Sequence, residues 1–207
     1  MLNERFSAGK TGRGGIAGRQ TPASLARESP SLHETSNEMN GLIEEWQQHA
    51  KRKENQNFDF LNWLKQRDSQ NRVDAIAKES HEEVFSQIDC TKCANCCKTI
   101  SPQVNKADIK RISAVLEISE TEFIERYLKI DDENQYQMNS LPCPFLEDDK
   151  CGIYAVRPKD CQEYPHTNKT GFTHRRYLHI ANTSVCPAVY HILETMKDRF
   201  NRRGKQQ

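Results

Sequence analysis

Apolar residues recur every three to four positions over much of the chain, which is the spacing of one face of an α-helix. Before the first cysteine this pattern predicts three helices, over about 36–53, 60–64 and 70–88. Ser36 or Asn37 supplies an N-cap for the first of them. We expect the aromatic residues on these helices to be core, with a surface for a protein partner as the alternative.

Two shorter helices are expected after the first group of cysteines, because each has a capping pattern in front of an apolar stripe. Asn105 with Asp108, and Ser119 with Glu122, have the three-residue spacing of a capping box. Two helices in this order resemble a helix-turn-helix, but the turn lacks its usual glycine and neither helix has a strongly basic face. We therefore expect a structural helical pair and no nucleic-acid partner.

Residues 131–182 have no helical periodicity and many turn-forming residues. Short extended runs are expected at 136–138 and 152–154, and a hairpin turn at 147–150. The stretch has too few apolar side chains to fold alone, so we expect its cysteines to cross-link it. A final helix is expected from Pro187, since proline suits the first helical position.

Composition and charge narrow the class of protein. The 207 residues carry 30 basic and 29 acidic side chains, a net charge of +1, so no global charge attracts nucleic acid or an anionic membrane. Apolar residues make up 35% of the chain and the mean hydropathy is −0.88, which predicts a modest core. No apolar run is long enough for a transmembrane helix.

The two ends of the chain are polar. Residues 1–35 are rich in Gly, Ser, Arg and Pro, so we expect a disordered tail. They contain no apolar signal-peptide core, which favours a cytoplasmic protein in a reducing compartment, with an organelle transit peptide as the alternative. Residues 201–207 form a basic tail whose charge suits the end of a helix, with an anionic partner as the alternative.

Four of the eight cysteines fall within eight residues, at Cys90, Cys93, Cys96 and Cys97. The C-x2-C-x2-C spacing lets one loop turn three thiolates toward a metal ion or cluster. Buried or disulfide-bonded cysteines are the alternative, but cysteine packing alone does not require this spacing. Soft thiolate ligands suit iron, iron–sulfur clusters and zinc.

The other four cysteines follow at Cys143, Cys151, Cys161 and Cys186. Adjacent side chains in an extended loop point apart, so we expect Cys96 and Cys97 to face different centres, or one of them not to bind the metal directly. One allocation places Cys90, Cys93 and Cys96 on one centre with a remote cysteine, and Cys97 with the downstream cysteines. Cys186 stands before a helix, where backbone N–H groups favour the thiolate form. Eight thiolates make either two four-thiolate sites or one shared binuclear site, and the sequence does not choose between them.

Three histidines lie among the downstream cysteines, at His166, His174 and His179. Each is a candidate metal ligand or a hydrogen-bond donor to a thiolate. The alternative for each is ordinary polar surface or a satisfied core position.

The order of the motifs resembles a known family. Over about residues 88–190 the chain is similar to the cysteine-cluster (CxxCxxCC) family described as zinc- or iron-chelating domains. The similarity is carried by Cys90-x2-Cys93-x2-Cys96-Cys97, Cys143-Pro-Phe-Leu146, Cys151-Gly-Ile-Tyr154, Arg157-Pro158, Cys161 and Tyr164-Pro165. The resemblance implies metal chelation and, for most members, no established reaction. A similar cluster occurs in flagellin lysine N-methylases. After Cys161 the family has an arginine, and this chain has Gln162.

The sequence thus predicts a mostly helical α+β fold with a small irregular or β, cysteine-rich segment between helices. The expected parts are a disordered tail (1–35), a helical extension (36–88), a metal-binding domain (89–200) and a basic tail (201–207). The expected function is chelation of iron, an iron–sulfur cluster or zinc by the eight cysteines.

Two other functions stay open. One is a methyltransferase-like or redox enzyme acting at the cluster, although the chain has no glycine-rich cofactor loop and no convincing acid–base pair. The other is a structural zinc module whose N-terminal helices bind another protein.

Overall fold

The structure is a computed structural model that describes residues 45–204, with side chains described as far as Asn201. Residues 45–52 are helical, and they are the part of the first expected helix that lies within this range. The expected caps at Ser36 and Asn37, and the tail at 1–35, lie outside the described residues.

The remaining elements follow in a fixed order along the chain. They are α2 (Glu54–Arg67), α3 (Gln70–Phe85), η1 (Cys90–Lys92), α4 (Asn95–Thr99), α5 (Lys106–Val115), α6 (Glu120–Tyr127), β1 (Leu128–Ile130), β2 (Tyr136–Met138), β3 (Leu146–Glu147), β4 (Lys150–Cys151), η2 (Tyr154–Val156), α7 (Lys159–Glu163), η3 (Phe172–Arg175), α8 (Arg176–Thr183) and α9 (Pro187–Gly204).

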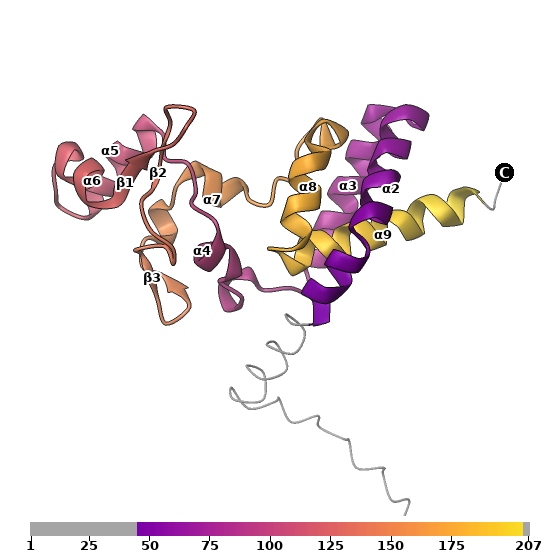
Figure 1. Cartoon of the computed structure of the whole chain (residues 1–207), viewed down its shortest axis with the longest axis horizontal. Coiled ribbons are helices and arrows are strands. Elements are labelled where there is room, and N and C mark those ends of the chain that lie inside the picture. The colour runs from indigo at the N-terminus through magenta and orange to yellow at the C-terminus, as the bar shows by residue number, and fades with distance from the viewer. Residues whose placement is uncertain (1–44, 205–207) are drawn as a thin grey trace, which may run out of the picture.

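These elements gather into two lobes (Figure 1). The helical lobe consists of α2, α3, η3, α8 and α9, and the small lobe consists of the elements from α4 to α7. The chain crosses from the helical lobe to the small lobe through residues 86–94 and returns through residues 164–171. The helical lobe is therefore built from both ends of the described chain.

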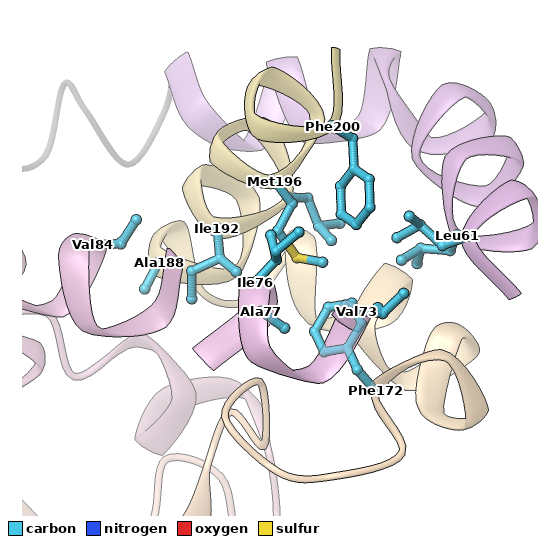
Figure 2. Packing of buried hydrophobic residues seen from close by; sticks show 12 residues of the cluster. Leu61, Val73, Ile76, Ala77, Val84, Phe172, Ala188, Ile192, Met196 and Phe200 are labelled. Atoms are coloured by element: carbon cyan, nitrogen blue, oxygen red, sulfur yellow. The ribbon is translucent and has the colours of Figure 1, made fainter. Parts of the chain in front are cut away.

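The core of the helical lobe forms where α3 packs along α9 and α2 packs along α8. Apolar side chains from α2, α3 and α9 form one cluster with Phe172, which is fully buried and lies beside Val73 (Figure 2). Full burial of each large apolar side chain contributes about 1.5–3 kcal/mol. The buried members are Leu61, Leu64, Val73, Ile76, Ala77, Val84, Phe172, Ala188, Ile192, Leu193, Met196 and Phe200.

The returning chain is fixed to α3 by one carboxylate. Asp74 accepts hydrogen bonds from the backbone N–H groups of Gly171 and Phe172, at 2.8 and 2.9 Å. Gly171 has a φ of +75°, a left-handed conformation that glycine adopts without a steric penalty. This turn places Phe172 in the core of the helical lobe.

The small lobe has its own apolar core, and its two main helices begin at the predicted caps. Asn105 and Asp108 form the reciprocal capping box in front of α5, and the Ser119 hydroxyl accepts a hydrogen bond from the N–H of Glu122 at the start of α6. The apolar faces of these helices meet the strands and the chain after them. The buried members are Val104, Ile109, Ile112, Phe123, Leu128, Met138, Phe145 and Ile153.

Two short antiparallel ribbons complete the small lobe. β1 pairs with β2, which confirms the extended run expected at 136–138. β3 pairs with β4, which confirms the hairpin turn expected at 147–150. Asp148 and Asp149 occupy the turn with φ of 46° and 61°, the left-handed pair that a tight type I′ hairpin requires.

Two expectations for residues 131–182 are wrong. The extended run expected at 152–154 is a turn that leads into η2. The stretch also contains the helices α7 and α8, although its sequence has no helical apolar period. The period fails for α8 because the residues that it buries are polar: His179, Asn182 and Thr183.

The predicted fold class, mostly helical α+β, is confirmed. The helical lobe joins residues from both sides of the expected boundary at 88/89, since α3 packs against α9. The division into domains stays a prediction. Within residues 45–204, no helix combines the length and the apolar character that crossing a membrane requires.

Candidate metal centre

A cavity of about 350 Å³ lies where the two lobes meet, and all eight cysteines line it. The first four come from the crossing segment and α4, and the next three come from the small lobe. The last, Cys186, comes from the helical lobe, directly before α9. Residues separated by as much as 96 positions in the sequence thus share one cavity.

The C-x2-C-x2-C segment folds into two short helical turns. Asp89 caps η1 by accepting a 3.0 Å hydrogen bond from the N–H of Thr91, and the N–H of Cys93 donates to the carbonyl of Cys90. Ala94 then has a φ of 52° and is buried, so the chain reverses there before α4 begins. A left-handed alanine costs roughly 1–2 kcal/mol, which the surrounding packing must offset.

Cys96 and Cys97 lie side by side in α4, with their sulfur atoms 4.0 Å apart. The extended loop expected for this pair is therefore wrong. The Cys96 thiol stabilises the neighbouring thiolate and the charge of Lys98 assists, so that the pKa of Cys97 falls to about 7. The same interaction raises the pKa of Cys96, and burial raises it further.

Burial is the main influence on the other shifted thiols. It raises the pKa of Cys90, Cys143, Cys151 and Cys161, because a thiolate loses hydration there. Burial raises the pKa of Cys186 to about 11, even though the N–H groups of Val189 and Ala188 act in the opposite direction. The helix start therefore favours the Cys186 thiolate, as expected, but burial outweighs it.

Comparisons with known proteins agree with this arrangement. Residues 89–186 match the family described as "Putative zinc- or iron-chelating domain", CxxCxxCC. This part of the chain is therefore similar to the CxxCxxCC family. Over 82 residues the chain is 33% identical to the uncharacterized protein MJ0661 of Methanocaldococcus jannaschii. That similarity covers 38% of this chain and 44% of the relative, so the chain spans less than half of that protein. No solved structure matches.

The thiols that line the cavity fit a thiophilic metal or cluster. All eight thiols are free, and soft thiolates are the ligands that iron, iron–sulfur clusters and zinc prefer. Within residues 45–204, no three His, Cys, Asp or Glu side chains are already close enough to hold an ion. The residues therefore fit a metal by the chemistry of their sulfur donors and by sharing one cavity. Metal binding would have to bring the sulfur atoms closer together.

The candidate histidines do not belong to this cavity. His166 lies 3.4 Å from a carboxylate oxygen of Asp160, and His174 is exposed on η3. His179 is fully buried in the helical lobe and stacks on Phe172 with the ring centroids 4.1 Å apart. None of the three lines the cavity, so the alternative of a structural or surface role holds for each.

Sequence reasoning gave no role to two further residues that line the cavity, Arg157 and Tyr164. The Arg157 guanidinium lies over the ring of Tyr154 at 3.9 Å, and its positive charge partly offsets the effect of burial on the pKa of Cys90 and Cys151. The Tyr164 hydroxyl is buried and has no hydrogen-bond partner among the described residues. Burial raises the pKa of this phenol strongly. In the sequence, the feature that could have pointed to Arg157 and Tyr164 is that each belongs to a motif of the family resemblance, Arg157-Pro158 and Tyr164-Pro165.

Proposed function

We propose that this protein binds iron, as an ion or an iron–sulfur cluster, through its eight cysteine thiolates, with zinc as the alternative metal. One observation carries the proposal: eight free thiols from both lobes line a single cavity. Residues 89–186 match a family described as zinc- or iron-chelating, which supports iron and zinc as the candidate metals. The bound group would supply the cross-links that join these segments.

The pKa values support the same proposal. Burial raises the pKa of most of the shifted thiols, so these stay protonated near neutral pH and are poor nucleophiles. Cys97 is the exception, because its pKa is lowered to about 7. A metal ion displaces the proton of a buried thiol, and its bond to sulfur offsets the loss of thiolate hydration. A buried, thiol-rich cavity is thus suited to binding a cation or a cluster.

A reducing compartment, such as the cytoplasm, follows from the proposal. Eight free thiols around one cavity persist only where disulfide formation is disfavoured. In an oxidising compartment, Cys96 and Cys97 or other close pairs would be lost as ligands by oxidation.

The test is anaerobic purification followed by metal analysis and an absorption spectrum. Visible absorption together with iron identifies iron or a cluster, whereas zinc gives a colourless protein. Cys93→Ser should lower the bound metal per chain, because it removes one thiolate. Thr91→Ser, which alters the same loop but no thiol, is the control and should leave the metal content unchanged. Full metal content in Cys93→Ser would contradict the proposal.

A further inference from the structure

We propose that the eight thiols form two four-thiolate centres with different mechanical roles, an inference that rests on the proposed metal binding. Centre A consists of Cys90, Cys93, Cys96 and Cys186 and joins the two lobes. Centre B consists of Cys97, Cys143, Cys151 and Cys161 and closes the small lobe on itself.

Centre A is brought together by a hydrogen bond between the lobes. The side-chain amide of Asn95, next to Cys96, donates to the carbonyl of Val185 at 2.7 Å. Val185 immediately precedes Cys186, so this bond holds the start of α4 against the start of α9. The turn of η1, closed by the N–H of Cys93 and the carbonyl of Cys90, lies directly before this contact.

Centre B is brought together by backbone pairing within the small lobe. The N–H of Cys143 donates to the carbonyl of Cys97 at 2.8 Å, which ties the β3–β4 hairpin to α4. In the hairpin Cys151 pairs with Leu146, whose own N–H donates to the carbonyl of Cys143 at 3.0 Å. Three of the four thiols are thus carried by segments that hydrogen-bond directly to one another.

Cys161 joins this group from α7. That helix is held to the chain after α4 by Asp160, whose carboxylate accepts a 3.1 Å hydrogen bond from the N–H of Gln103. Cys161 lines the same cavity as Cys97, Cys143 and Cys151. These are the other three members of centre B.

The border between the centres runs through the pair Cys96–Cys97. Their sulfurs are 4.0 Å apart, and η1, which carries Cys90 of centre A, contacts β4, which carries Cys151 of centre B. The two centres are therefore adjacent. The competing arrangement is one binuclear site in which a thiolate of this pair bridges both metals.

The two centres differ in which parts of the protein they join. The chain crosses between the lobes twice and the Asn95–Val185 hydrogen bond also joins them. Centre A adds a connection through the metal, because Cys186 is the one thiol of the eight that comes from the helical lobe. The buried Tyr164 hydroxyl lies on the returning crossing, and Tyr164 lines the same cavity as Cys186, Cys96 and Cys93. It is placed to donate a hydrogen bond to a thiolate of centre A.

The decisive experiment uses the unmodified chain loaded with cadmium-113 under reducing, anaerobic conditions. Each cadmium ion correlates in NMR only with the Hβ protons of the cysteines that bind it. We expect two cadmium resonances, each correlated with four cysteines in the groups of centre A and centre B. A cysteine correlated with both ions, a single resonance, or a different grouping would overturn the inference. Failure to bind cadmium at all would overturn the proposed function as well.

Paired variants provide an independent measurement. Cys90→Ser with Cys186→Ser should retain one cadmium ion by native mass spectrometry and keep the amides of the β3–β4 hairpin protected from exchange. Cys143→Ser with Cys151→Ser should also retain one ion but lose that protection. Loss of both ions in either folded variant, checked by circular dichroism, would indicate one shared site and contradict the two centres.

Discussion

The carboxylate of Asp108 accepts a 3.1 Å hydrogen bond from the backbone N–H of Lys159, 51 residues further along the chain. The same buried carboxylate accepts from the N–H of Asn105 and from the Arg111 guanidinium. It therefore caps α5 and also fixes the start of α7, the helix that carries Cys161. A local capping motif thus contributes to the position of a candidate metal ligand.

We expect Asp108→Ala to lower the free energy of unfolding by about 3 kcal/mol, because it removes a cap and leaves buried donors without an acceptor. Urea unfolding followed by circular dichroism measures the change. Glu122→Gln, which removes an exposed ion pair with Arg126, is the matched control and should cost less than about 1 kcal/mol. Equal losses in the two variants would mean that burial of Asp108 has no energetic role.

Asn95→Ala should weaken metal retention without unfolding either lobe. The variant loses the 2.7 Å hydrogen bond to Val185, worth about 0.5–1.5 kcal/mol, which holds Cys186 against α4. We expect metal transfer to a chelator to be several-fold faster. The matched control is Asn139→Ala, which loses an equivalent 2.8 Å side-chain bond to the carbonyl of Arg126, away from the cavity. Identical transfer rates in the two variants would contradict a role for the Asn95 contact.

His179 should make the helical lobe sensitive to acid. Burial, with a smaller effect of the Arg175 charge, lowers the pKa of His179 from its ordinary value of 6.5 to about 3. Between these values the unfolded chain binds more protons than the folded chain, so stability is complete above pH 6.5 and falls as the pH decreases. From pH 6.5 to 4.5 the loss is on the order of 2–3 kcal/mol.

His179→Phe tests this prediction, because it keeps a ring against Phe172 and removes the proton-binding site. The free energy of unfolding of this variant should fall less between pH 6.5 and 4.5 than that of the parent chain. His81 and His191 also have a pKa lowered by burial, and both remain in the variant, so the difference isolates His179. A replacement of the exposed His174 by Gln should leave the profile unchanged. Parallel profiles for the parent and His179→Phe would refute the prediction.

The sequence predicted what depends on neighbouring residues. The caps at Asn105 and Ser119 and the hairpin turn at 147–150 follow from side-chain chemistry within four residues, and all three are present. The helix α8 was missed because its buried side chains are polar, so no apolar period marks it. The spacing of apolar residues reveals a buried helix face only where the buried side chains are themselves apolar.

In the candidate metal site too, the sequence predicted what depends on local spacing and missed what depends on tertiary contacts. The spacing of the cysteines predicted the candidate metal ligands, and the structure brings all eight to one cavity. The spacing suggested one grouping but did not choose between the possible partitions, because contacts such as the backbone hydrogen bond between Cys97 and Cys143 span 46 positions. Nor could it indicate Tyr164, whose significance is a buried hydroxyl without a partner among the described residues. Both facts depend on tertiary contacts.

Removal of metal should release the β3–β4 hairpin and leave the helical lobe folded. The hairpin pairs only two residues on each strand and buries Phe145 and Ile153 beside it. The helical lobe, by contrast, has twelve buried residues in its own core. Structural zinc contributes apparent free energies of about 10–16 kcal/mol in small domains, far more than two short strands provide. The cross-links through Cys143 and Cys151 are therefore expected to hold the hairpin in place.

Hydrogen exchange on the metal-loaded and chelator-treated chain measures this release. The amide of Gly152, which donates to the carbonyl of Phe145 at 2.8 Å, should exchange at least about a hundredfold faster after chelation. Amides in the middle of α3, such as that of Ala77, should keep their protection because their core contains none of the seven cysteines from Cys90 to Cys161. If Gly152 stays as protected without metal as with it, apolar packing alone holds the hairpin, and thiolate–metal bonds have no structural role there.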